Sequence, residues 1–296
     1  MKISVIGAGV MGARITEVLI KGGHDVVMID TNRDHATGSL NRIVADLAIG
    51  VEKGKLTKEE SDAALARITI SNMCSDAAGS ALVLECINEH LDDKVTLLKQ
   101  LDTILDEDCI IGTNTSALPI SEIARAVPHR ADHILGVHFF NPAHIMKLVE
   151  ITRTISTDQA VIDTVVDIMK GVDKHPIVVN EGAGFVVNRI LIPEINEAIG
   201  IYADNIASPS DIDRAMQLGA GMKVGPLHTA DLVGLDDILS DLSNMYEETG
   251  DPKYHPHPLL RKMVRAGLLG QKSGRGFFTY KYPFGPEVPG GELKIK

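Results

Sequence analysis

The sequence lacks the features that mark several specialised classes of protein. It contains no tryptophan, 4% aromatic residues and three cysteines, Cys74, Cys86 and Cys109. An odd number of cysteines without metal-ligand spacing argues against a disulfide framework and a metal site, and we expect three small, buried hydrophobic side chains. No run reaches the roughly 18 apolar residues of a membrane span. Glycines interrupt the apolar start, MKISVIGAGVMGARI, so no secretory signal peptide is expected.

Positive charge is also scarce. Lysine and arginine number 29 against 40 aspartates and glutamates, which gives a net charge of −11. Nucleic acids and acidic membrane surfaces are bound through basic patches, so neither is an expected partner. A few local lysines could still bind an anionic small molecule. With few cysteines and no membrane segment, the expected location is the reducing cytoplasm.

The first 180 residues alternate short β-branched runs with helical patterns. The expected strands are residues 2–7, 25–30, 81–87, 109–114, 133–140, 147–151 and 176–180. Such alternation predicts a parallel sheet with helices on both faces, a Rossmann-type doubly wound α/β domain.

From about residue 183 the pattern becomes helical, and no strand is expected. We predict a dinucleotide-binding domain at 1–182, an all-helical substrate and dimerisation domain at 183–282, and a loose Pro- and Gly-rich tail at 283–296. Thr57 and Ser208 are expected to begin helices as N-caps. The two glycines within residues 181–184 are a candidate hinge.

The stretch VIGAGVMG places Gly7, Gly9 and Gly12 in G-x-G-x-x-G spacing, after an expected strand and at the start of an expected helix. This context predicts a dinucleotide site with the pyrophosphate at the helix N-terminus. Asp30 ends the second strand, where a carboxylate accepts bonds from ribose hydroxyls and repels a 2′-phosphate. NAD is therefore the expected cofactor, and Arg33 nearby keeps NADP as an alternative.

Polar residues follow several expected strands. Asn114 and Ser116 come after one strand, and His138 lies near the end of the next, within the apolar run GVHFFNP. Glu150 follows on another strand, and Asn188 begins the first long helix. A histidine in such a run is often only a satisfied core residue. The competing hypothesis is that His138 is a general base oriented by the Glu150 carboxylate.

These segments resemble one family. NTSALPISEIA, GVHFFNPAHIMKLVEI, EGAGFVVNRILIPEINEA and the later DIDRAMQLGAG with DLVGLD are similar to the short-chain L-3-hydroxyacyl-CoA dehydrogenases, which include 3-hydroxybutyryl-CoA dehydrogenases. The similarity covers about residues 1–282. It implies an NAD-dependent oxidoreductase that interconverts 3-hydroxyacyl and 3-oxoacyl thioesters, by default 3-hydroxybutyryl-CoA and acetoacetyl-CoA. It also implies a homodimer that forms through the helical domain.

The resemblance implies a role for each matching residue. His138 would exchange the proton of the 3-hydroxyl, Glu150 would orient its ring, and Ser116 and Asn188 would donate to the 3-oxygen. Glu89 and Lys94 match family positions near the nicotinamide half of the cofactor, and Asn114 is a further expected cofactor contact. Lys53 and Lys55 are candidates to bind the coenzyme A end, and Asn141 is a further expected substrate contact.

The sequence departs from the family pattern at Ala117, Ala143–His144, Lys223 and His228–Thr229–Ala230. These changes leave the reaction class intact and open the substrate to alternatives. Lys223, His144 and His228 would suit a short polar hydroxyacyl group on an acyl carrier protein, and a free sugar acid is a further possibility. A dinucleotide-binding protein without turnover is the alternative from another class, which the intact set of four catalytic positions argues against.

Overall fold

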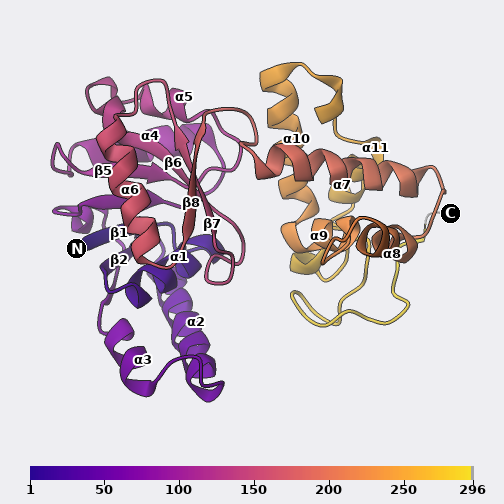
Figure 1. Ribbon diagram of the computed structural model, residues 1–296, viewed down its shortest axis with the longest axis horizontal. Helices are drawn as coiled ribbons and strands as arrows, with labels where there is room; N and C mark the ends of the chain where they lie inside the picture. The colour runs from indigo at the N-terminus through magenta and orange to yellow at the C-terminus, as the bar shows by residue number, and fades with distance from the viewer. Residues whose placement is uncertain (295–296) are drawn as a thin grey trace. The chain divides into compact units, whose positions relative to one another are not determined.

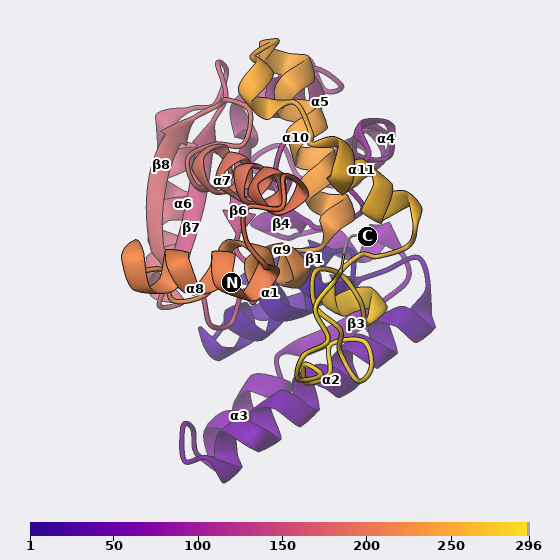
Figure 2. The ribbon, with the colours of Figure 1, turned by 90° about the vertical axis from the view of Figure 1, so that its right-hand side faces the viewer.

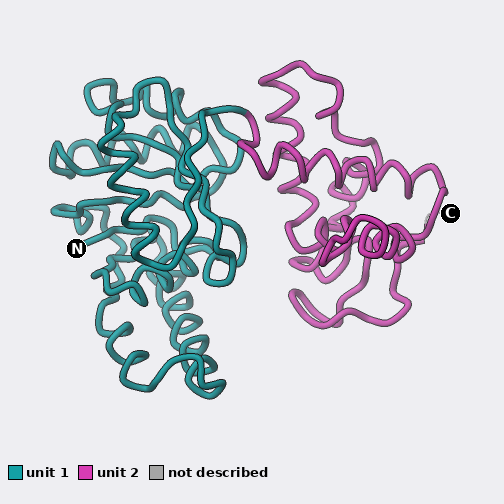
Figure 3. Tube along the Cα trace, in the orientation of Figure 1, with its two compact units in different colours: residues 1–182 teal, residues 183–296 magenta. Residues whose placement is uncertain are grey.

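An eight-stranded sheet organises the N-terminal part of the chain (Figure 1). The computed structural model describes residues 1–294, and the chain divides into two compact units, residues 1–182 and 183–296 (Figure 3). The strand order is β3-β2-β1-β4-β5-β6-β7-β8. The strands are β1 (Lys2–Ile6), β2 (Asp25–Ile29), β3 (Ile68–Ser71), β4 (Leu82–Glu85), β5 (Ile110–Thr113), β6 (Ile134–Phe139), β7 (Leu148–Arg153) and β8 (His175–Asn180).

Helices cover both faces of this sheet, which confirms the predicted fold class. The helices are α1 (Val10–Lys21), α2 (Arg33–Glu52), α3 (Lys58–Leu65), α4 (Leu91–Asp102), α5 (Ile120–Ala124) and α6 (Gln159–Gly171). Apolar residues of α1, α2 and α6 share one buried cluster with strand residues such as Val5 and Val149. On the other side, residues of α4 and α5 lie beside Ile111 and Ile134. The α2–α3 pair projects away from the sheet (Figure 1 and Figure 2).

Two details of the sheet differ from the sequence prediction. Strand β3 was not predicted, because it has only four residues and lies at the sheet edge. Only one of its four residues, Ser71, is buried, so it shows no apolar run. The prediction of a wholly parallel sheet is wrong at β7, which runs antiparallel to β6. The connection from 140 to 147 is shorter than the dozen or so residues that a parallel crossover requires.

Local signals in the sequence set where the helices begin. Thr57 and Glu60 form the expected capping box at the start of α3, because each side chain bonds the other residue's amide. Ser208 accepts from the Asp211 amide and begins α8 (Pro209–Gly219), with proline in its first turn. These predictions are confirmed.

The second unit consists of helices around its own apolar core. They are α7 (Val187–Ala203), α8, α9 (Pro226–Val233), α10 (Leu235–Thr249) and α11 (Pro258–Arg265). Its core includes Ile195, Leu227 and Phe277. Gly234, with a φ of 111°, separates α9 from α10. Within residues 1–294, no helix is both long and apolar enough to cross a membrane.

The segment that the composition suggests as a loose tail packs onto this unit over its described part, up to residue 294. The Leu293 amide donates to the Phe277 carbonyl at 2.8 Å, and the Tyr202 hydroxyl donates to the Leu293 carbonyl at 2.5 Å. The Val288 amide also donates to the Thr279 carbonyl. The expectation of a loose segment is therefore wrong for these residues, since bonds to distant partners override the local Pro and Gly signal.

Candidate active site

The turn between β1 and α1 is shaped by glycines. Gly7 has a φ of 99°, and a Cβ there would lie 2.5 Å from the Cys86 carbonyl oxygen. A Cβ on Gly12 would lie 1.8 Å from the Gly7 carbonyl oxygen. At Gly9 a Cβ would meet nothing within 4 Å. Gly7 and Gly12 thus let the turn pack against helix and sheet, while Gly9 leaves the backbone open to a ligand.

The start of α1 is suited to an anion. Gly9 precedes the helix, no side chain caps it, and its first turn contains no acidic residue. Its first amides and the positive end of the helix dipole can therefore face a pyrophosphate. The Asp30 carboxylate fixes the neighbouring loops, since one oxygen accepts from the Ala8 amide and the other from the Asn32 amide, both at 2.9 Å.

A cleft of about 560 Å³ lies beside these groups, at the ends of β1, β2 and β4. Its lining joins Gly7, Gly9 and Asp30 to apolar side chains such as Ile87 and Leu97. This combination of open amides, a carboxylate and apolar walls fits NAD. The sequence prediction missed eight polar lining residues, Thr31, Asn32, His35, Asn72, Asn88, Asp93, Thr96 and Gln100. Asn72 directly follows β3, so recognition of that strand would have revealed it.

His138 and Glu150 form a buried pair on adjacent strands. They are opposite each other in the β6–β7 register, and His138 Nδ1 lies 2.9 Å from Glu150 Oε2. Their side chains are 7% and 0% exposed. Because the carboxylate engages Nδ1, it favours a proton on that nitrogen and makes Nε2 the atom suited to proton exchange. The Phe140 ring packs edge-on against the imidazole, with centroids 4.6 Å apart.

The loop after β5 lies at the same end of the sheet as His138, since β5 and β6 run parallel. Thr113 pairs with Gly136 in the β5–β6 register, so Ser116 and His138 both lie just beyond that pair. The Asn114 side chain, predicted to contact the cofactor, accepts from the Phe139 amide at 2.9 Å. This bond ties the Ser116 loop to the strand that carries His138.

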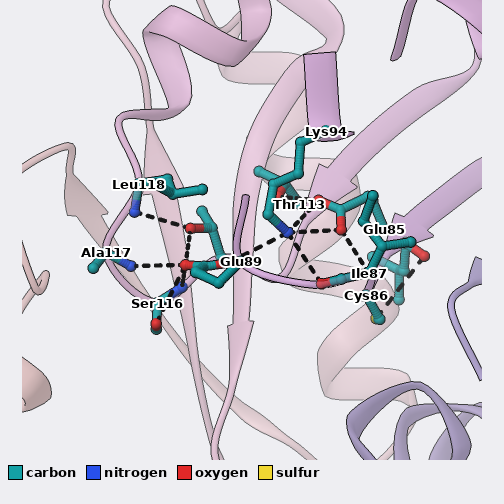
Figure 4. Close-up of polar contacts among 11 residues, drawn as sticks. Glu85, Cys86, Ile87, Glu89, Lys94, Thr113, Ser116, Ala117 and Leu118 are labelled. Carbon is teal, nitrogen blue, oxygen red and sulfur yellow. Dashed lines mark hydrogen bonds and ion pairs between the residues drawn. The ribbon is translucent and has the colours of Figure 1, made fainter. Parts of the chain in front are cut away.

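Glu89 also holds the Ser116 loop (Figure 4). Its Oε1 accepts from the Ser116 amide at 2.8 Å, the Ala117 amide at 3.3 Å and the Ser116 hydroxyl at 3.3 Å. The Thr115 hydroxyl donates to the same oxygen. One carboxylate oxygen thus gathers the donors of three consecutive residues.

Lys94 links this carboxylate to a second one. Its Nζ lies 2.7 Å from Glu85 and 3.3 Å from Glu89, and its side chain is 1% exposed (Figure 4). Burial lowers the pKa of Lys94, but the two carboxylates raise it more, so the net shift is upward. Burial raises the pKa of Glu89, and Lys94 with the loop donors lowers it more. Lys94 and Glu89 therefore each stabilise the charged form of the other.

The remaining predicted residues lie elsewhere. Asn188 lies in the first turn of α7, where its Nδ2 is 3.5 Å from Asp241 Oδ2. Lys53 and Lys55 are exposed at the turn that follows α2. Asn141 is exposed in the β6–β7 connection. The structure does not gather these four residues into one site within either unit.

Of the unusual residues, His228 has the clearest environment. Its ring lies between Asp213 and Glu287 and stacks on Phe278, with centroids 3.6 Å apart. Burial lowers the pKa of His228, but its bonds to the two carboxylates raise it to about 9. His228 therefore anchors the C-terminal segment of its own unit, which weakens the argument that it adapts the enzyme to a polar substrate. Lys223 is exposed, and burial lowers the pKa of His144.

Comparison with known proteins identifies the family. Residues 2–182 match the 3-hydroxyacyl-CoA dehydrogenase NAD binding domain, and residues 184–280 match the corresponding C-terminal domain. A 3-hydroxybutyryl-CoA dehydrogenase of Clostridioides difficile is 43% identical and spans 95% of this chain and 99% of its own. The human mitochondrial hydroxyacyl-coenzyme A dehydrogenase is 39% identical, over 94% of this chain and 91% of its own.

Solved structures agree with this result. The crystal structure of (S)-3-hydroxybutyryl-CoA dehydrogenase from Ralstonia eutropha superimposes with a TM-score of 0.89 at 40% identity, and covers 95% of this chain and 99% of that one. The predicted enzyme class and NAD as cofactor are thereby confirmed. The chain belongs to the 3-hydroxyacyl-CoA dehydrogenase family.

Proposed function

We propose that this enzyme interconverts 3-hydroxybutyryl-CoA and acetoacetyl-CoA with NAD, and that His138 is its general base and acid. The observation that carries this proposal is the buried His138–Glu150 pair, joined at 2.9 Å at the edge of the sheet that also bears the Ser116 loop. The four-carbon substrate is supported by the name of the 43% identical relative.

In the direction of oxidation, His138 takes the proton of the 3-hydroxyl group. Gly9 and Asp30 would hold NAD in the cleft, where its nicotinamide would supply the acceptor for the hydride on C3. The Glu150 carboxylate, fully buried beside the ring, stabilises the imidazolium that forms. In the reverse direction, His138 returns the proton to the 3-oxygen. A histidine suits both steps because imidazole titrates near neutral pH.

Ser116 is proposed to donate a hydrogen bond to the 3-oxygen, where negative charge develops as the proton leaves. This role is supported by the strand register. Thr113 pairs with Gly136, and Ser116 and His138 each follow one of these two residues closely in the chain. The family resemblance assigns Asn188 as a second donor. Lys53 and Lys55, both exposed and in no ion pair within residues 1–294, are candidates to bind the coenzyme A phosphates.

The decisive test is NADH oxidation with acetoacetyl-CoA by the native enzyme and two histidine variants. His138→Asn should lower kcat by about a thousandfold while NADH still binds. His129→Asn, which alters an exposed histidine on the same unit, should leave kcat unchanged. Near-native turnover by His138→Asn would contradict the assignment. The same acyl group on a carrier protein should be the poorer substrate, and a clear preference for it would shift the proposal to the carrier-protein alternative.

We also propose that the enzyme is a homodimer formed through its helical unit. Ile190, Ile206 and Leu218 of this unit are 67%, 70% and 78% exposed, which is unfavourable for an apolar surface left in water. Sedimentation equilibrium should give twice the chain mass, and Ile190→Asp should reduce that mass to one chain. A native enzyme of single-chain mass at micromolar concentration would refute the proposal.

A further inference from the structure

The hydrogen bonds at Glu89 distinguish the backbone of Ser116 from its hydroxyl. The Ser116 amide donates to Glu89 Oε1 at 2.8 Å, a normal distance, while the hydroxyl donates to the same oxygen at a longer 3.3 Å. A serine hydroxyl has one proton, so it cannot donate to Glu89 and to a substrate oxygen at once. The weaker of the two bonds is thus the one that substrate would replace.

The carboxylate that holds this loop is itself held by an ion pair (Figure 4). Lys94, in the first turn of α4, pairs with both Glu89 and Glu85. Glu85, at the end of β4, also accepts from the Thr113 hydroxyl at 2.6 Å and the Ile87 amide at 2.7 Å. The cluster therefore connects β4, α4 and β5 to the Ser116 loop.

We propose that Glu89 is a positioning residue that presents Ser116 to the 3-oxygen of the substrate, with the Lys94–Glu85 pair as its rigid support. Glu89 keeps the backbone of the loop in place through the amides of Ser116 and Ala117, and its longer bond to the hydroxyl is exchanged for one to substrate. This inference rests on the proposed function, because it requires Ser116 to act on the substrate oxygen. It gives Glu89 a role separate from the cofactor contact that the family resemblance implies.

A double-mutant cycle tests this coupling. The variants are Glu89→Gln, Ser116→Ala and the double variant. The control is Asp92→Asn, which removes an exposed carboxylate from the first turn of α4. Steady-state kcat with acetoacetyl-CoA is measured for each variant, together with NADH affinity by fluorescence titration. Hydrogen exchange at residues 115–117 reports directly on the loop, and thermal unfolding shows that each variant is folded.

We expect Glu89→Gln to lower kcat by about tenfold, and Ser116→Ala by about a hundredfold. In the Ser116→Ala background, Glu89→Gln should change kcat by less than about threefold, since two residues that act through one group are not additive. NADH affinity should stay within about threefold of the native value, and exchange at 115–117 should accelerate in Glu89→Gln but not in Asp92→Asn.

Three results would overturn the inference. Multiplicative losses in the double variant would show that Glu89 acts independently of Ser116. A loss of NADH affinity as large as the loss of kcat would assign Glu89 to the cofactor. If Ser116→Ala retained full activity, the proposed role of Ser116 would itself fail, and this outcome is distinct from a cycle in which both residues matter separately.

Discussion

Glu150 lies directly across the β6–β7 pair from His138, and the two side chains meet at 2.9 Å with almost no exposure to solvent. Both residues belong to one sheet, so the backbone fixes their separation before any ligand binds. In such a site the charge of Glu150 acts at short range and with little screening by water.

Glu150→Gln should therefore lower kcat by about a hundredfold or more, because an amide stabilises imidazolium poorly and can hold the wrong tautomer. NADH affinity should be retained, since the change is outside the cleft lined by Asp30. The measurement is kcat by steady-state kinetics, with Glu122→Gln on the exposed side of α5 as the control. Activity within about twofold of native in folded Glu150→Gln would refute the orienting role.

Asp30→Asn should alter the choice of cofactor. The native carboxylate bonds the amides of Ala8 and Asn32 and carries the charge that opposes a 2′-phosphate. Removal of that charge should narrow the preference for NADH over NADPH by about tenfold, or about 1.4 kcal/mol. Fluorescence titration with both nucleotides measures the ratio of the two affinities. Asp34 is an exposed acid in the first turn of α2, and Asp34→Asn should leave this ratio unchanged. An unaltered ratio in Asp30→Asn would count against Asp30 as the discriminating group.

Two glycine-to-alanine changes should have opposite effects on stability. Gly12→Ala would place a Cβ 1.8 Å from the Gly7 carbonyl oxygen, which should destabilise the protein by about 1–3 kcal/mol and weaken NADH binding. Gly38→Ala lies within α2 with open space around it, and should stabilise the protein by about 0.5–1 kcal/mol. Urea unfolding monitored by circular dichroism gives both values. Equal effects would show that the close approach at Gly12 does not constrain the turn.

The pair of carboxylates around His228 predicts a pH dependence of stability. The pKa of His228 is raised to about 9 in the folded protein. The stability that the charged His228 ring contributes is therefore complete below about pH 6.5 and is lost as pH rises through 9. The loss should be about 1–2 kcal/mol, since the side chain is 31% exposed and solvent screens part of the interaction.

The check is the unfolding free energy of the native protein and of His228→Asn between pH 6 and pH 9.5. The difference between the two proteins should shrink as pH rises across that range. A constant difference would mean that the stability due to His228 comes from its stacking on Phe278 and not from its charge.

Features that depend on short, local patterns of residues could be predicted from the sequence. The glycine turn after β1, the caps at Thr57 and Ser208 and the change to a helical second unit depend on neighbouring residues, and all appear in the structure. The family resemblance also predicted that His138 and Glu150 act together, and the structure places them side by side.

Features that depend on distant partners could not be predicted. Strand β3 exists because β2 offers it an edge, and residues 68–71 alone contain too few residues to show a pattern. The C-terminal segment has a loop-like composition and is held by Tyr202 and Phe277. Likewise, the sequence did not predict the ion pairs of His228, because Asp213 and Glu287 are distant from it along the chain.

The reversal of β7 has a consequence for how the pairing of His138 and Glu150 can change. Side chains alternate between the two faces of a strand, so a slip of one residue between β6 and β7 would turn either His138 or Glu150 to the opposite face. The pairing of the two residues therefore depends on strand register, which residues 140–147 help to set. Insertions of one residue in that connection that are absorbed by a shift of β7 should eliminate the pair while the fold survives.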